Sequence, residues 1–275
     1  MIFKDQMRNS DKMKKKFFYI TMIGILFSSC NSDDDSGNPD QNNPLTESLI
    51  ELGIKYGPED RQFLDLYKAR SECPTPVYFD AHANGQDTSM PSEIVDNLNA
   101  AGITVISWES ITLINTPEET MTGWNDAELM FQWVIDNAET YNLDTSNIII
   151  GGSSRGTILS WIYGHRPNQN IKGLYMYNAL PKPAWLAPSW WLPTDNVTVE
   201  SPPIYFVYNR EPGSSTDPVE PDIHDPNYGT IIVDKYVDLN IGNRATLTHS
   251  IGQTNNTDRY QFLVDFAMSV IETCP

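Results

Sequence analysis

A short segment near the middle of the chain combines glycine, serine and arginine in a pattern that could do chemistry. Residues 148–152 read Ile-Ile-Ile-Gly-Gly, and Ser153, Ser154, Arg155 and Gly156 follow. Residues 152–156 fit G-x-S-x-G, in which a serine on a tight turn exposes its hydroxyl and the flanking glycines let neighbouring backbone approach closely. Ser154 is therefore a candidate nucleophile. A phosphate-binding loop and an ordinary connecting turn are the alternatives.

The segments around this turn alternate between strand-like and helix-like patterns. The expected helices are Ser92–Ala101, Asn125–Tyr141, Thr230–Leu239 and Arg259–Glu272. The expected strands are Gln62–Tyr67, Val77–Phe79, Ile103–Trp108, Asn147–Ile150, Gly173–Tyr177, Ile204–Tyr208 and Ala245–Thr248. Such alternation predicts a mostly parallel sheet with helices on both faces. In such sheets a ligand binds at the carboxyl ends of the strands, which is where Ser154 falls.

Cofactor and metal chemistry are not expected. The turn is similar to the nucleotide loop of short-chain dehydrogenases, but that loop follows the first strand of its fold, and no Tyr-x-x-x-Lys follows the turn here. The four histidines are scattered, and no pair of Cys or His has the spacing of metal ligands.

Four longer segments carry a resemblance to a known family. They are "YGPEDRQFLDLYKA" (56–69), "PVYFDAHANG" (76–85), "AAGITVISWES" (100–110) and "NLDTSNIIIGGSSRG" (142–156). Together they resemble the carboxylesterase and lipase-like family of the α/β-hydrolase fold, from about residue 52 to the C-terminus. The resemblance implies an α/β-hydrolase fold with a mostly parallel central sheet, helices on both faces and no large lid domain.

The resemblance also implies a set of catalytic groups. Ser154 would be the nucleophile, and the backbone N–H groups of Arg155 and of Ala83 or Asn84 would form the oxyanion hole. Ala83 and Asn84 stand where the family has glycines.

The triad acid and histidine should follow Ser154 in that order. Asp222 is the favoured acid and Glu211 the alternative. His249, directly after the last expected strand, is the candidate base, although it comes early in its loop; a structural histidine is the alternative. His224 and His165 are interpreted as structural.

The function that follows is a serine hydrolase that cleaves a carboxylic ester through an acyl-enzyme. Three tryptophans after the sixth strand, Trp185, Trp190 and Trp191, offer flat faces to sugar rings or aromatic acyl groups, or else pack on the domain itself. They favour an ester on a glycan as substrate. The alternative is a catalytically degenerate hydrolase that acts as a surface glycan-binding protein.

The N-terminal segment resembles a bacterial lipoprotein signal peptide of the Bacteroidetes type. Four lysines between positions 12 and 16 precede an apolar run from Phe17 to Phe27 that is too short to span a bilayer, and Cys30 follows. This predicts a signal peptide over 1–29, a lipid on Cys30, an acidic disordered tether over 30–44 and a hydrolase domain over 45–275. The protein would be anchored by lipid to the outer membrane and exposed at the cell surface.

Charge and cysteine content add two further expectations. Residues 1–29 hold 6 of the 18 basic and 2 of the 36 acidic residues, so residues 30–275 carry a formal charge of −22. That charge argues against nucleic acid as a partner and against contact with anionic membranes other than through the lipid. Cys73 and Cys274 either form a disulfide or remain two buried thiols.

Overall fold

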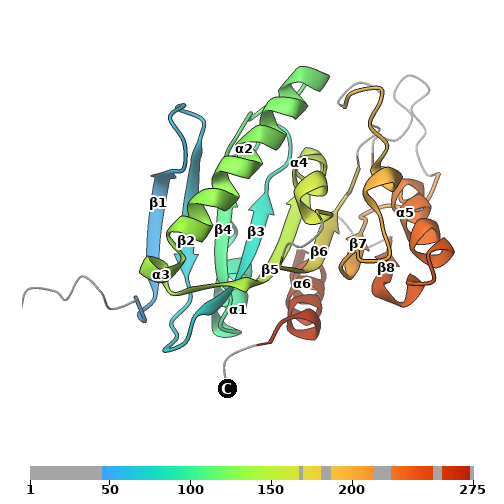
Figure 1. The fold of residues 1–275 in the computed structure, drawn as a ribbon. Coiled ribbons are helices and arrows are strands. Elements are labelled where there is room, and N and C mark those ends of the chain that lie inside the picture. The colour runs from blue at the N-terminus through green and yellow to red at the C-terminus, as the bar shows by residue number, and fades with distance from the viewer. Residues whose placement is uncertain (1–44, 167–169, 181–186, 214–223, 250–255, 273–275) are drawn as a thin grey trace, which may run out of the picture. The chain divides into compact units, whose positions relative to one another are not determined.

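An eight-stranded sheet forms the centre of the computed structural model, which describes residues 45–166, 170–180, 187–213, 224–249 and 256–272. The strands are β1 (Leu49–Lys55), β2 (Phe63–Lys68), β3 (Thr75–Ala81), β4 (Thr104–Trp108), β5 (Leu143–Ser153), β6 (Ile171–Tyr177), β7 (Ile204–Val207) and β8 (Ala245–Thr248). Their order is β1-β2-β4-β3-β5-β6-β7-β8 (Figure 1). Strands β3 to β8 are mutually parallel, whereas β2 is antiparallel to both β1 and β4.

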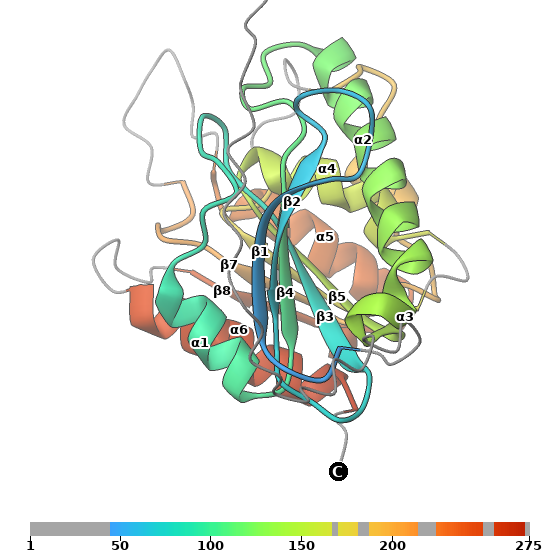
Figure 2. The same ribbon diagram turned by 90° about the vertical axis from the view of Figure 1, so that its left-hand side faces the viewer.

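Helices cover both faces of the sheet (Figure 2). One face packs against α1 (Ser92–Ala100) and α6 (Asn256–Val270), and the other against α2 (Pro117–Asp136), α4 (Arg155–Gly164) and α5 (Asn227–Asp238). The short helices are α3 (Ala138–Tyr141), η1 (Pro193–Asn196) and η2 (Gly242–Arg244). Because parallel strands need crossover connections, α1, α2, α4 and α5 each lie between two strands in sequence, whereas α6 follows the last strand. Each face of the sheet has its own hydrophobic core. The expected mostly parallel sheet with two helical layers is confirmed.

Two elements differ from the sequence expectation. Helix α2 begins at Pro117 rather than Asn125, since Thr116 and Glu119 form a capping box: Thr116 Oγ1 accepts from the Glu119 N–H at 3.2 Å, and a Glu119 carboxylate oxygen accepts from the Thr116 N–H at 3.0 Å. Strand β1 was not expected at all. It is an edge strand whose large apolar side chains are mostly exposed, so it lacks the in-and-out alternation of a half-buried strand.

Cys73 is disulfide-bonded, and the sequence's other two cysteines lie outside the described residues. The pairing with Cys274 stays a prediction. The Glu272 carbonyl accepts from Asn147 Nδ2 at 3.4 Å, so the end of α6 lies beside the start of β5, and the carbonyl of Cys73 accepts from Asn142 Nδ2 at 3.0 Å just before that strand. Glu272 and Cys73 are therefore held at the same end of the sheet.

No helix within the described ranges is both long enough and apolar enough to cross a bilayer.

His165 follows the last residue of α4 and is buried. Its Nδ1 donates to the carbonyl of Trp161 at 3.0 Å, and its ring lies 4.2 Å from the Trp161 ring. Within the described structure its Nε2 has no hydrogen-bond partner. Burial lowers the pKa of His165 to about 4, because a charged ring would lose its hydration there.

This shift predicts how stability depends on pH. The unfolded chain protonates His165 near pH 6.5 and the folded chain only near pH 4, so the free energy of unfolding falls as the pH falls through that window. Between pH 7.5 and 4.5 we expect wild type to lose about 2 to 3 kcal/mol more than a His165→Gln variant. Urea unfolding of both proteins at the two pH values measures the difference. Equal losses would show that His165 does not carry this dependence.

Candidate active site

Ser154 occupies the single-residue turn between the end of β5 and the start of α4. Its backbone has φ 52° and ψ −119°, a positive φ that non-glycine residues adopt rarely and at a cost of about 1 to 3 kcal/mol. This conformation directs the Ser154 side chain away from the sheet, at the carboxyl end of a central strand. The strand-turn-helix context that the G-x-S-x-G pattern requires is therefore present.

The two glycines of the pattern are required by close approaches of backbone. A Cβ on Gly152 would lie 2.7 Å from the carbonyl carbon of Gly156. A Cβ on Gly156 would lie 1.8 Å from the carbonyl oxygen of Ala81 and 2.8 Å from that of His82. The first turn of α4 thus packs directly on the end of β3 and on the loop that follows it.

That loop carries Ala83 and Asn84, whose backbone N–H groups donate no hydrogen bond within the described part of the chain. The Asn84 side chain donates from Nδ2 to the carbonyl of Ile114 at 2.9 Å and accepts from the Ile114 N–H at 2.8 Å. Gly85 closes the turn with φ 71°, and its N–H donates to the carbonyl of Thr112. The loop is therefore fixed from both sides, and its residues 83 and 84 line the same cavity as Ser154.

A buried charged network lies beneath these two segments. The His82 Nε2 lies 3.0 Å from Glu109 Oε1, and Arg155 Nη2 lies 3.7 Å from the same oxygen and 2.9 Å from the His82 ring nitrogens. The Arg155 guanidinium also donates to the carbonyl of Ile111. The three side chains join the helix after Ser154, the loop after β3 and the loop after β4.

The electrostatics of this network keep Arg155 and Glu109 charged. Burial lowers the pKa of Arg155 to about 10, with the Glu109 charge opposing the shift. Burial by itself would raise the pKa of Glu109, but the hydrogen bond and charge of His82 bring it below its usual value. Sequence reasoning used only the main chain of Arg155 and missed Glu109. The acidic residue directly after a buried strand, in "SWES", was the available signal.

His224 is the residue that hydrogen-bonds to Ser154: its Nε2 lies 2.8 Å from Ser154 Oγ. It belongs to the segment that leads into α5, and it lines the cavity. His224, interpreted from the sequence as a structural residue, is thus a loop residue that contacts Ser154. Asp222, the favoured acid, lies outside the described residues.

His249 does not reach Ser154 in this structure. Its Nδ1 lies 3.2 Å from Glu211 Oε2, and both side chains are largely exposed. His249 directly follows β8, three strands along the sheet from β5, and three strand spacings amount to about 14 Å. The structure thus brings His224, and not the expected His249, to Ser154, and it pairs Glu211 with His249.

Trp190 and Trp191 are not among the described residues that line the cavity. Trp191 is buried and packs on Trp124, with ring centroids 5.5 Å apart, and Trp190 lies on the same ring at 6.2 Å with two thirds of its surface exposed. Trp185 lies outside the described residues. Within the described residues, Trp190 and Trp191 therefore pack on the helical face of the domain, the alternative that the sequence left open.

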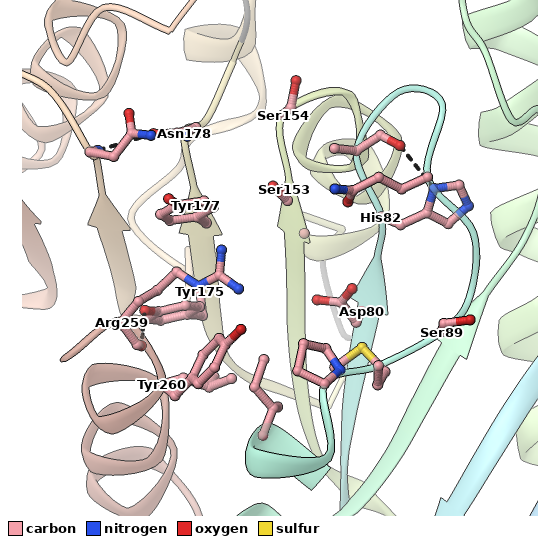
Figure 3. Close-up of a pocket in the computed structure, with 18 of the residues that line it drawn as sticks. Asp80, His82, Ser89, Ser153, Ser154, Tyr175, Tyr177, Asn178, Arg259 and Tyr260 are labelled. Atoms are coloured by element: carbon pink, nitrogen blue, oxygen red, sulfur yellow. Dashed lines mark hydrogen bonds between the residues drawn. The ribbon is translucent and has the colours of Figure 1, made fainter. Parts of the chain in front are cut away.

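The cavity at Ser154 has a volume of about 900 Å³ and extends well beyond this serine. Figure 3 shows Asp80, Tyr175, Tyr177, Arg259 and Tyr260 along it, below Ser153 and Ser154. These residues come from β3, β6 and α6, so the cavity runs along the sheet face that α1 and α6 cover. No cluster of three or more His, Cys, Asp or Glu able to hold a metal ion occurs among the residues that the structure describes.

The fold and site can be compared with known proteins. No protein-family model matches the chain, and no curated protein is significantly similar to it in sequence. Solved structures are similar in fold. A truncated carbohydrate esterase from gut microbiota aligns with a TM-score of 0.62 at 16% identity, over 82% of this chain and 98% of that chain.

Two further structures agree with the first. Thermogutta terrifontis esterase 2, phosphorylated by paraoxon, aligns with a TM-score of 0.60 at 11% identity, over 83% of this chain and 96% of that one. Esterase B from Lactobacillus rhamnosis, solved with a tributyrin phosphonate, aligns with a TM-score of 0.55 at 12% identity, over 84% of this chain and 88% of that one. Together with the strand order, these similarities show that the chain has an α/β-hydrolase fold.

The Gly156 contact predicts a specific sensitivity to substitution. A Gly156→Ala change forces α4 away from rigid backbone at Ala81 and His82, so we expect the free energy of unfolding to fall by about 1 to 3 kcal/mol. Gly164→Ala, in the same helix, is the matched control, because its Cβ would meet only the Leu174 side chain, which can rotate. Urea unfolding of both variants and of wild type measures the two losses. An equal or smaller loss for Gly156→Ala would contradict the role given to this contact.

Proposed function

We propose that this chain, an α/β-hydrolase in fold, is a serine hydrolase that cleaves carboxylic esters through an acyl-enzyme intermediate. The observation that carries the proposal is the 2.8 Å hydrogen bond between Ser154 Oγ and His224 Nε2, at a strained turn on the rim of a large cavity. A serine hydroxyl is a weak nucleophile until a neighbouring base removes its proton, and His224 is in position to do so.

The chemistry follows from this pair. His224 Nε2 takes the proton as Ser154 Oγ attacks the acyl carbon, and the ring then gives the proton to the departing alkoxide. A water molecule then attacks the acyl-enzyme: His224 takes a proton from the water and gives it to Ser154 Oγ, and the carboxylic acid is released. The His224 ring must keep its other proton on Nδ1, facing an acceptor. Asp222 is the proposed acceptor, while Asp225 is already engaged with the N–H groups of Gly213 and Asn227, each at 2.9 Å.

The oxyanion of the tetrahedral intermediate would lie between two segments. The Arg155 N–H belongs to the first turn of α4, where amides have no partner within the helix and the helix dipole is positive. Ala83 and Asn84 line the cavity from the loop after β3, and their N–H groups would supply the donor on the other side. Each such donor contributes about 3 kcal/mol to transition-state stabilisation. The Arg155 side chain, through Glu109 and His82, fixes the distance between the two sides.

A carboxylic ester attached to a glycan is the proposed substrate. One structural neighbour is described as a carbohydrate esterase, and the cavity is lined by polar and aromatic side chains suited to a hydroxylated ligand. The alternative of a degenerate, glycan-binding hydrolase rested on the absence of a base beside Ser154. His224 removes the reason for preferring it.

Substitutions of the two histidines and the serine test the assignment. We expect Ser154→Ala to abolish both labelling by a fluorophosphonate probe and hydrolysis of p-nitrophenyl acetate. His224→Gln should lower kcat/KM by about 10² to 10⁴-fold, because the base is lost while the fold is kept. His249→Gln is the matched control and should change kcat/KM by less than about threefold, since its ring binds Glu211.

Two outcomes would contradict this assignment. Equal labelling of wild type and Ser154→Ala would exclude Ser154 as the nucleophile and with it the proposed activity. A large loss in His249→Gln combined with a small one in His224→Gln would make His249 the base and Glu211 its acid.

Lipidation of Cys30 and display on the outer membrane are also part of the proposal, and they are supported by the N-terminal sequence alone. In bacteria fed radiolabelled palmitate, we expect the wild-type chain to carry label and to remain with the membrane fraction, and Cys30→Ala to do neither. Fluorescent antibody staining of intact cells distinguishes surface display from the periplasmic side. Unlabelled wild-type protein in the culture medium would contradict the anchor.

A further inference from the structure

The deep end of the cavity contains a carboxyl group and a guanidinium that the proposed ester chemistry does not use. Asp80 comes from β3, one residue before its end, and Arg259 from the first turn of α6. Figure 3 shows the two side chains on opposite walls below Ser153, each directed toward the space between them. Arg259 is the one side chain in the described lining with a permanent positive charge.

The Asp80 carboxyl is oriented by Tyr78. The Tyr78 hydroxyl donates to Asp80 Oδ1 at 3.0 Å, and the Tyr78 ring lies against β5 at Gly151, where an added Cβ would come within 2.1 Å of its hydroxyl oxygen. Gly151 is outside the G-x-S-x-G pattern, so the nucleophile does not require it. Burial raises the pKa of Asp80, with the Tyr78 hydrogen bond and the Arg259 charge opposing the shift.

Arg259 is held by aromatic rings rather than by an acid. Its guanidinium lies 4.2 Å from the ring centroid of Tyr177 and 4.7 Å from that of Tyr260. The Tyr175 hydroxyl donates to the Arg259 carbonyl at 2.6 Å, which fixes the first turn of α6 on β6. Across the residues that the structure describes, Arg259 forms no ion pair, and the N–H groups on its open edge face the cavity.

The ligand group that fits both side chains must accept a hydrogen bond from Arg259 and donate one to Asp80. A hydroxyl does both. A carboxylate would be repelled by Asp80, an ammonium group by Arg259, and an apolar group would leave both side chains desolvated without partners. Met90, Ile94 and Leu263 supply apolar surface beside them, on which the body of a ring can pack.

We propose that Asp80 and Arg259 form a subsite that binds the hydroxyl groups of a six-membered ring in the substrate. The inference rests on the proposed function, because the ester bond of the same molecule must reach Ser154. Two sources supply such a ring: a sugar on the alcohol side of the ester, and a hydroxylated aromatic acyl group. The subsite replaces Trp190 and Trp191 as the substrate contact within the described residues.

Matched pairs of esters with and without the hydroxyl groups test the subsite. One pair is methyl 4-hydroxycinnamate and methyl cinnamate, and the other is an acetylated methyl xyloside and cyclohexyl acetate. For one pair we expect the kcat/KM of wild type to favour the hydroxylated ester at least about tenfold, since unpaired polar groups in the site disfavour the analogue. The pair that shows this preference identifies the source of the ring.

The preference should depend on the two side chains. In Arg259→Met and Asp80→Ala we expect the ratio of kcat/KM within the preferred pair to fall close to one. Tyr78→Phe, which keeps the ring but removes the hydrogen bond to the Asp80 carboxyl, should lower this kcat/KM ratio by a smaller factor. Arg70→Met is the control for loss of an arginine: Arg70 is exposed and pairs with an exposed Glu47, so the ratio should stay at the wild-type value. Thermal unfolding of each variant shows that it is folded.

A binding measurement separates this inference from the proposed activity. The same four esters are titrated into Ser154→Ala by calorimetry, where no turnover is needed, and again into Ser154→Ala/Arg259→Met. Tighter binding of a hydroxylated ester that is lost with Arg259 supports the subsite even if no ester is hydrolysed, in which case only the proposed activity fails. Equal affinities within both pairs, or a preference that survives removal of Arg259 and of Asp80, would overturn the subsite while leaving hydrolysis at Ser154 intact.

Discussion

The approach of α4 to the end of β3 is the contact on which the site depends. Gly156 lies so close to the carbonyl oxygens of Ala81 and His82 that no side chain fits between them. This places the first amides of α4 opposite the loop that holds Ala83 and Asn84. The proposed oxyanion hole depends on this placement, because donors that are already in position need no rearrangement when charge develops between them.

The buried network of Arg155, Glu109 and His82 maintains that approach. Taking an arginine and a carboxylate out of water is unfavourable unless they are paired and hydrogen-bonded. Glu109 meets this condition through His82, the Ser110 N–H at 2.9 Å and the Thr112 hydroxyl at 3.3 Å. Because removal of any one partner leaves a buried charge, the network resists small displacements of the three loops and holds their relative positions.

The sequence predicted the sheet and the turn of the proposed nucleophile because both depend on local patterns. All five residues of β4 are buried, in keeping with its mainly apolar and β-branched sequence, and the turn at Ser154 is specified by glycines two residues away on either side. The proposed base could not be assigned in the same way. His224 and His249 come after two neighbouring strands, β7 and β8, and which of the two reaches Ser154 depends on tertiary placement, which no local pattern records.

The tryptophans show the same limit. Trp190 and Trp191 have the composition of a ligand site, but both pack on Trp124 of α2, and neither is among the described residues that line the cavity.

The consecutive glycines 151 and 152 show that one short segment can satisfy two separate requirements. Gly152 gives room to the backbone of α4 and so serves the turn that carries Ser154, whereas Gly151 gives room to the Tyr78 hydroxyl on the face covered by α1 and α6. Successive residues of a strand point to opposite faces, so neither glycine can substitute for the other. A single strand thereby couples the position of Ser154, the proposed nucleophile, to the orientation of Asp80, so that the proposed reaction centre and the proposed hydroxyl subsite are held in one rigid frame.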